Sequence, residues 1–194
     1  MFAQALNVTL RILVLRAGPQ DFPFGAGLTP VLVLLAAAAN TAVFSRVLPL
    51  PMALGIALAM VLAMAVVTRS ILRARKLDNR FAQTFDALMA TGAVLTLALL
   101  PPFAQIAPQL LDLAKHPEAL ADPEKVQMPG LPVFVMNLLN FWSFAVTAHI
   151  FRHAANVQLW VGLFIAFLAA GVSLFIGIIG GTFAGALFGA NLGG

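Results

Sequence analysis

The sequence has no cysteine and few charged residues. The absence of cysteine from its 194 residues excludes disulfide bonds, thiolate metal sites, iron–sulfur clusters and cysteine nucleophiles. Charged residues make up 9% of the chain, hydrophobic residues make up 61%, and the mean hydropathy is +0.99. Because a water-soluble domain of this size needs more polar surface to cover its core, we expect a membrane protein.

Sequence motifs for chemistry are also missing. The chain shows no phosphate-binding glycine-rich loop, no paired carboxylates and no nucleophile–base arrangement. We therefore expect neither enzymatic activity nor a cofactor. The pI near 10.8 comes from basic residues that border apolar segments, which favours contact with anionic phospholipids of the lipid bilayer over a nucleic-acid partner.

The positions of the basic residues predict how the chain crosses the membrane. Of the 11 Lys and Arg residues, Arg46, Lys115 and Lys125 lie in one set of gaps between apolar segments, and all others lie in the alternate gaps. Basic residues concentrate in cytoplasmic loops. We therefore expect a bacterial inner-membrane protein with a cytoplasmic N-terminus and a periplasmic C-terminus. The residues of the alternate gaps are Arg11, Arg16, Arg69, Arg73, Arg75, Lys76, Arg80 and Arg152.

The apolar segments predict an all-α, polytopic membrane protein that forms a single membrane domain with five transmembrane helices. Pro101 and Pro102 are expected to end the third span, because proline disrupts a helix interior. The following segment, 103–131, carries four acidic and two basic residues and is expected to form an extracytoplasmic loop. The predicted spans are 29–45, 52–68, 81–100, 132–149 and 159–180.

The two ends of the chain differ from the spans. Residues 1–25 are expected to form a cytoplasmic interfacial segment, whose amphipathic helix is too short to cross the hydrocarbon region. It has an apolar stripe that consists of Phe2, Leu6, Leu10 and Leu13. After the last predicted span, Gly180 and Gly181 favour a break, and 181–194 is an apolar glycine-rich tail that spans, protrudes or re-enters the membrane.

A stripe of small residues at intervals of four is the strongest local pattern. Such residues let membrane helices approach closely, where lipid offers no hydrophobic driving force. One interpretation is a helix-packing seam for a homo-oligomer or a larger membrane complex. The other is internal packing against the first or third span. The stripe consists of Ala169, Ser173, Gly177, Gly181, Gly185 and Gly189.

A second pattern places Arg69, Arg73, Lys76 and Arg80 on one face of a helix that would continue beyond the second span. This stripe is expected either to recognise an anionic lipid head group or an acidic partner, or to serve as a topology anchor. Basic clusters beside membrane helices are widespread, which favours the anchor.

Asp86 is expected to lie inside the third span, where an ionised carboxylate is costly without a partner. The predicted topology offers His149, Arg152 and His153, with Arg80 as a neighbour. The group forms either a structural ion pair or a proton or cation relay. His149 and His153 have a spacing that suits metal ligands, but no cysteine or carboxylate nearby in sequence completes a site, so no metal is expected.

Uncharged polar residues gather on two of the predicted spans. They either hydrogen-bond between helices or line a hydrated path. Trp142 is expected in the core, and Trp160 suits the aromatic belt at the membrane surface. The uncharged polar residues are Asn40, Thr41 and Ser45 on the first span, and Asn137, Asn140, Ser143 and Thr147 on the fourth.

The layout resembles the YIP (Ypt-interacting protein) family and, more closely, small five-span proteins of proteobacteria. The resemblance rests on Arg16 with the turn 18–23, on 80–91, and on Trp142 with 149–153. It implies a non-enzymatic scaffold or accessory subunit that acts through helix–helix and lipid contacts. The binding of small GTPases is not expected, because only about 25 residues precede the first span. The alternative is a small transporter, channel or lipid-handling protein with a path along the fourth span toward Asp86.

Overall fold

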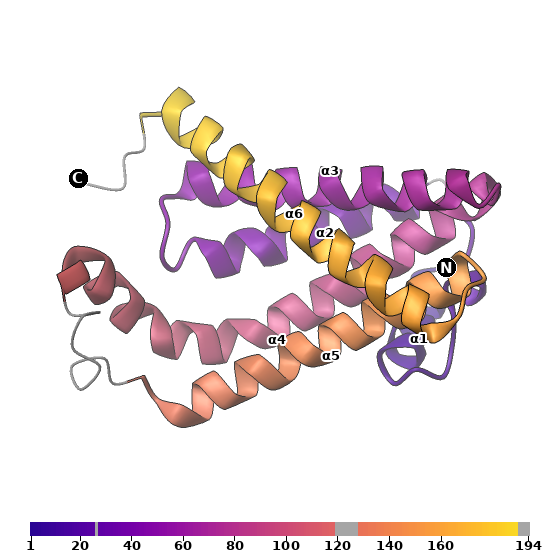
Figure 1. Cartoon of the computed structure of the whole chain (residues 1–194), viewed down its shortest axis with the longest axis horizontal. Coiled ribbons are helices and arrows are strands. Elements are labelled where there is room, and N and C mark those ends of the chain that lie inside the picture. Colours follow the sequence, from indigo (N-terminus) through magenta and orange to yellow (C-terminus); the bar gives the residue numbers. More distant parts are fainter. Residues whose placement is uncertain (26, 119–127, 190–194) are drawn as a thin grey trace.

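A computed structural model describes residues 1–25, 27–118 and 128–189, and this part of the chain is all-helical. Figure 1 shows the helices as an elongated bundle. The α-helices are α1 (Phe2–Leu13), α2 (Leu28–Phe44), α3 (Leu50–Ala74), α4 (Phe81–Lys115), α5 (Gly130–Ala154) and α6 (Leu159–Leu187), and the short 3₁₀ helices are η1 (Pro19–Asp21) and η2 (Asp78–Arg80).

Five helices form a ring in the order α2, α3, α6, α5, α4, in which each helix packs against the next and α4 closes the ring on α2. The most extensive of these interfaces joins α3 and α6. α5 and α6 are close where the chain connects them and diverge toward their other ends (Figure 1). The ring is therefore tight at one end and open at the other.

The helices have the length and composition of membrane spans. Within the described chain, α3, α4 (counted with η2), α5 and α6 are each long and apolar enough to cross a bilayer. α2 is a shorter apolar helix of 17 residues. These elements occupy the five predicted spans.

Two predicted helix ends are wrong. α4 does not end at Pro101 but continues through Pro101, Pro102 and Pro108 to Lys115. Each proline removes one backbone donor, and the helix bends in its second half instead of stopping (Figure 1). α6 likewise passes through Gly180 and Gly181 without a break and ends at Leu187. The rest of the predicted tail, 190–194, lies outside the described residues, as does part of the predicted loop.

The helix α1 packs against α4 and α5 at the tight end of the ring. It buries Ala5, Val8 and Ile12 against the bundle, whereas Phe2 and Leu6 on the predicted apolar stripe remain exposed. One apolar face of α1 therefore packs on the protein, and a second one faces outward. Such a helix suits the membrane interface, with one apolar face on the bundle and a second toward lipid.

The prediction that Trp142 lies in the core is wrong, because this side chain is 41% exposed on α5. Its indole N–H donates a hydrogen bond of 2.9 Å to the carbonyl oxygen of Leu13, at the end of α1. The tryptophan N–H needs a polar partner, and a free helix C-terminus provides one. This residue therefore fastens α1 to α5. Trp160 is 78% exposed at the start of α6, as the prediction requires.

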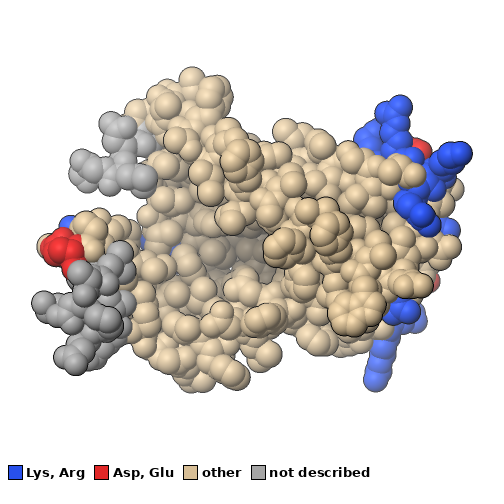
Figure 2. Space-filling model, viewed as in Figure 1, with Lys and Arg blue, Asp and Glu red and all other residues tan. Residues whose placement is uncertain are grey.

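Charge is separated along the long axis of the molecule. Figure 2 shows most Lys and Arg residues at one end, with a broad band free of charged residues between this end and the other on the viewed face. The alternate gaps that the sequence marks as basic thus come together in space.

Candidate functional site: a cleft inside the helix ring

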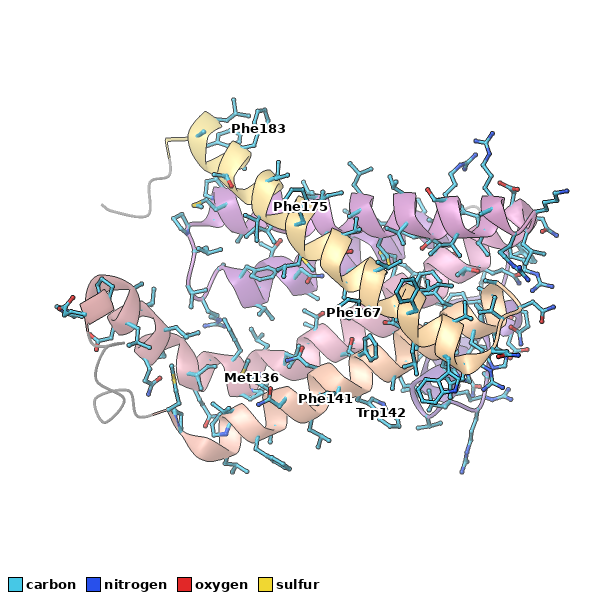
Figure 3. All side chains as sticks on the ribbon, viewed as in Figure 1. Met136, Phe141, Trp142, Phe167, Phe175 and Phe183 are labelled. Carbon is cyan, nitrogen blue, oxygen red and sulfur yellow. The ribbon has the colours of Figure 1, made fainter. Side chains whose placement is uncertain are left out.

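All five ring helices line a cleft of about 440 Å³. Figure 2 shows a hollow on the viewed face, and Figure 3 shows α5 and α6 farther apart at Met136 than at Trp142. The lining residues are Asn40, Val43 and Phe44 of α2, Met60 and Met64 of α3, Thr96, Leu99 and Phe103 of α4, Met136, Asn140, Ser143, Phe144 and Thr147 of α5, and Ala166, Ala170, Ser173 and Leu174 of α6.

A smaller inner cavity of about 170 Å³ adjoins this cleft. It reaches Ala36 on α2, Val61 on α3, and Leu88, Met89 and Gly92 on α4. The lining residues that the two cavities share are Asn40, Met60, Met64, Thr96, Ser143, Thr147 and Ser173.

The polar side chains are concentrated where the two cavities meet. Among the lining residues, Asn140 is the only uncharged polar side chain outside this shared set. All other unshared residues are apolar or glycine. The site therefore consists of an outer apolar lobe, a polar waist and an inner apolar lobe. We use "polar waist" for Asn40, Thr96, Ser143, Thr147 and Ser173.

The hydroxyl groups of the waist differ from most others in the chain. Thr9, Thr41, Thr84, Thr91 and Thr182 each donate a hydrogen bond to the carbonyl four residues earlier in their own helix. This back-bonding is how Ser and Thr are satisfied in helices.

Within the described chain, Thr96, Ser143, Thr147 and Ser173 make no such bond and no other side-chain hydrogen bond. Ser173 is only 3% exposed, and its Oγ has no partner among the described residues. A buried hydroxyl without a partner costs about 1–3 kcal/mol, which a bound molecule or water can offset.

Asn40, which also belongs to the polar waist, supplies a hydrogen-bond acceptor. Its amide nitrogen donates to the carbonyl oxygen of Ala36 at 2.8 Å. The amide oxygen is left to accept from a group in the cleft. The waist therefore offers both donors and acceptors, and no charged side chain is among the described lining residues.

The small-residue stripe of α6 faces α3 of the same chain. A Cβ atom added at Gly181 would lie 2.5 Å from Cγ1 of Ile56, and one at Gly177 would lie 3.0 Å from Cγ of Met60. The adjacent Gly180 approaches Gly55 and Ala59 just as closely. Ala169, Ser173, Gly177, Gly181 and Gly185 are all buried, and Ser173 also lines the cleft.

The stripe therefore packs within the described chain, as one alternative had it, but the expected partner is wrong: the stripe packs on α3, the second predicted span, and not on the first or third. The small Gly55 and Ala59 of α3 allow this close approach. Gly189 is not part of the stripe, because α6 has ended and Gly189 has a φ of +64°. A left-handed residue just after a helix is the usual position for glycine, since it has no Cβ to clash.

Asp86 lies apart from the polar waist. It is 3% exposed and lines a separate cavity of about 170 Å³ with Thr29 and 23–25. Its Oδ1 has no hydrogen-bond partner within the described residues, and it forms no ion pair there with His149, Arg152 or His153. The side chain faces Thr29 at the start of α2. Of the residues expected to pair with it, His149 and Arg80 bond elsewhere, Arg152 is exposed and His153 packs against the His149 ring.

His149 Nε2 is 2.9 Å from the carbonyl oxygen of Ala17, so this ring holds the turn after α1. The His149 and His153 rings are neighbours, with centroids 4.5 Å apart. Among the described residues no group of three metal-ligating side chains exists. Arg152 is exposed, and its Cβ lies beside Gly162 of α6.

The predicted basic stripe is interrupted. α3 ends at Ala74, and Lys76 has a φ of +58°, so Arg69, Arg73, Lys76 and Arg80 do not share one helix. Arg69 lies over the ring of Phe81, with 5.7 Å from its guanidinium carbon to the ring centroid. Arg73 and Lys76 are exposed.

Arg80 has a structural role that the sequence pattern did not indicate. Its Nη1 donates to the carbonyl oxygens of His153 at 3.4 Å and Ala154 at 3.3 Å, and Nε of Arg75 donates to that of Ala155 at 3.3 Å. Cations at a helix C-terminus satisfy free carbonyls and oppose the helix dipole. Two arginines therefore cap α5.

The sequence identified part of the cleft. The structure brings together Asn40, Asn140, Ser143 and Thr147, which belong to the polar residues that the sequence offers for a hydrated path. The sequence pattern does not indicate Met60, Met64 and Thr96. Each is an isolated residue in an apolar helix, and no spacing within α3 or α4 distinguishes it. Ser173 was noticed for its small size and not for its hydroxyl.

Comparisons with known proteins give no relatives. No family model matches the chain, and neither the curated proteins nor the solved structures give a match. The resemblance to the YIP family therefore stays a prediction.

Proposed function

We propose that this protein is a five-span membrane protein that binds a lipophilic small molecule in the cleft inside its helix ring. The observation that carries the proposal is the polar waist, whose hydroxyl groups lack partners between two apolar lobes. Sites for small molecules are mostly apolar cavities with a few polar groups that orient the ligand. The proposal keeps the lipid-handling alternative that the sequence offered, but it places the ligand at the polar waist and not on a path toward Asp86, which lines a separate cavity.

Membrane embedding is supported by the outer surface. Large apolar side chains are exposed along the helices, among them Leu58 and Leu62 of α3, Phe141 of α5, and Phe167 and Phe175 of α6 (Figure 3). Exposure of apolar side chains along whole helices is unfavourable in water and favourable in lipid.

The fifth span in the proposal is α2. Its 17 residues measure about 26 Å at 1.5 Å per residue, close to the hydrocarbon thickness of about 30 Å. With α2 spanning, the basic end of the molecule faces the cytoplasm, as the concentration of Lys and Arg requires. The open end of the ring then faces the periplasm.

A scaffold role receives less support than ligand binding. The sequence argument for an intermolecular seam rested on the small residues of α6. These residues pack on Met52, Gly55, Ile56 and Met60 of α3 within one chain. A partner surface would have to lie elsewhere.

The test is to fill the cleft and measure what the protein carries. Wild-type protein, purified in mild detergent, should retain a lipophilic molecule that native mass spectrometry detects as a defined added mass. Ser143→Phe fills the cleft and should lose this mass. Leu138→Phe, on the exposed face of the same helix, should keep it. Wild-type protein without any defined bound molecule would contradict the proposal, provided that it elutes as one folded species.

A further inference from the structure

We infer that the ligand of the cleft is an uncharged lipid whose hydrogen-bonding group lies between apolar parts, and that this group binds at the polar waist through Ser173. The inference rests on the proposed function and names the class of molecule that the site selects. Four observations lead to it: the order of the lobes, the free hydroxyl groups, the absence of lining charge and the shape of the opening.

The order of the lobes sets the order of groups along the ligand. Residues of the inner lobe, such as Leu88 and Met89, are apolar, and so are Leu99, Phe103 and Leu174 of the outer lobe. A molecule with its polar group at one extreme end would place that group against apolar side chains in either lobe. A glycerol ester has a polar centre flanked by carbon chains. Its polar centre would lie at the polar waist and its chains in the two apolar lobes.

The free hydroxyl groups set the chemistry of the polar group. Ser173 Oγ donates and accepts, and the amide oxygen of Asn40 accepts, because its nitrogen is already bonded to Ala36. A ligand hydroxyl beside a carbonyl satisfies both kinds of group. A hydrocarbon without polar atoms would leave the buried Ser173 hydroxyl unpaired.

The absence of charge disfavours ionised head groups. None of the residues described as lining either cavity is Asp, Glu, Lys, Arg or His. A phosphate or ammonium group at the waist would be buried without a counter-ion, which is strongly unfavourable in a low-dielectric site. Among Lys and Arg of the described chain, Arg46 is the closest in sequence to a lining residue, two positions after Phe44. An anionic lipid would therefore leave its head group at Arg46, outside the waist.

The opening favours access from the lipid. α5 and α6 are in close contact near Gly162, where an added Cβ would lie 2.8 Å from the carbonyl oxygen of Ala148. From there the two helices diverge, and the hollow on the viewed face lies in the band without charged residues (Figure 2), where large apolar side chains such as Phe141 and Phe167 are exposed. A lipid can pass between them without its chains leaving the bilayer.

Photo-crosslinking of the full chain in phosphatidylcholine nanodiscs tests the inference. Two probes with the same diazirine-bearing acyl chain are compared, a diacylglycerol and a phosphatidylglycerol. Peptides with Met60, Met64 and 143–147 should be labelled about tenfold more by the diacylglycerol. Ser173→Ala should lower this labelling about threefold to tenfold, the loss expected for one hydrogen bond. The control is Thr182→Ala, which removes an exposed hydroxyl that is bonded within the same helix.

The possible outcomes separate the two proposals. Equal labelling by both probes without an effect of Ser173→Ala overturns the inference and leaves a lipophilic cleft. Phosphatidylglycerol labelling that falls in Arg46→Gln, with no effect of Ser173→Ala, overturns it in favour of an anionic lipid held at the mouth. Failure of both probes to label these peptides in folded protein, with only water in the cleft, overturns the proposed function as well.

Discussion

At the scale of single residues, the polar groups of this membrane-like bundle differ in how they are satisfied. Several hydroxyl and amide groups bond within their own helix, as Thr91 does to the carbonyl of Ala87 at 2.7 Å. A few are buried and lack a partner among the described residues, namely Thr68, Asp86 and Ser173. Ser173 faces the cleft, whereas Asp86 faces a cavity of its own. The unsatisfied groups are therefore where ligands or water have to be considered first.

Asp86→Asn is predicted to leave the protein folded and to raise its free energy of unfolding by about 1–3 kcal/mol, because an amide has the same shape and no charge to bury. Thermal unfolding in detergent measures the change. Asp78→Asn, which alters an exposed carboxylate in η2, should have no effect. Loss of folded protein in Asp86→Asn would show instead that the carboxylate has an ionic partner.

At the scale of helices, the end of α5 depends on charged donors from elsewhere. Arg80→Ala removes the hydrogen bonds to the carbonyl oxygens of His153 and Ala154. We predict a loss of about 1–2 kcal/mol in the free energy of unfolding, the combined size of a charged hydrogen bond and a helix-dipole contact. Arg73→Ala, at an exposed position on α3, is the control and should have little effect. Equal losses in the two variants would mean that general charge, and not capping, is responsible.

The packing of α6 on α3 gives a second prediction at this scale. Gly181→Leu places a side chain where Cγ1 of Ile56 already lies 2.5 Å from the added Cβ, so α3 and α6 must separate. We expect a loss of at least about 2 kcal/mol, as for overpacked cores. Gly171→Leu is the matched control, because nothing lies within 4 Å of a Cβ at that glycine. If Gly181→Leu instead keeps its stability and changes only the oligomeric state, the stripe is an intermolecular seam.

The helices themselves were largely predictable, and the reasons are local. Long apolar runs and their flanking charges predict where helices exist, because both signals lie within about 20 residues. The end of α4 was not predictable from Pro101, since a proline in a membrane-like helix bends it when neighbouring groups replace the lost bond. The position of Asp86 away from its expected partners and the place of Met60 in the cleft were not predictable either. These depend on the rotation of each helix about its axis, which contacts between distant segments decide.

At the scale of the whole molecule, the helix ring and the separation of charge along its long axis are consistent with a single orientation in a membrane. The C-terminal ends of α1, α3 and α5 lie at the basic end of the molecule, and those of α2 and α4 lie at the other end (Figure 1). A closed ring would leave a ligand no route to the waist. Divergence of α5 and α6 provides one, while α3 and α6 hold the opposite side together. The same geometry therefore accounts for a rigid side and an accessible side.

The orientation in the membrane is the last prediction, and the lack of cysteine makes it directly measurable. Single cysteines at Ser45 and His116 should react with a membrane-impermeant maleimide in intact cells, because the proposed topology puts them in the periplasm. Cysteines at Asn79 and Gln158 should react only after the membrane is permeabilised. All four positions are exposed, so differences in labelling report the side of the membrane and not burial. The cysteine-free parent chain supplies an unlabelled background.

Each pattern of labelling has a distinct meaning for the fold in the bilayer. Labelling of Asn79 and Gln158 alone in intact cells would reverse the orientation and place the open end of the ring in the cytoplasm. Ser45 and His116 are separated by α3 and α4, so labelling of His116 without Ser45 would mean that one of these two helices does not carry the chain across. A further cysteine at the exposed Gln20 reports on α2, because labelling on the same side as Ser45 would mean that α2 does not carry the chain across. In that case the ring would have four spanning helices with α2 buried among them, and the cleft would lose a membrane-spanning wall. Labelling of Ser45 and His116 together, with protection of the other three positions, is what a five-span ring requires.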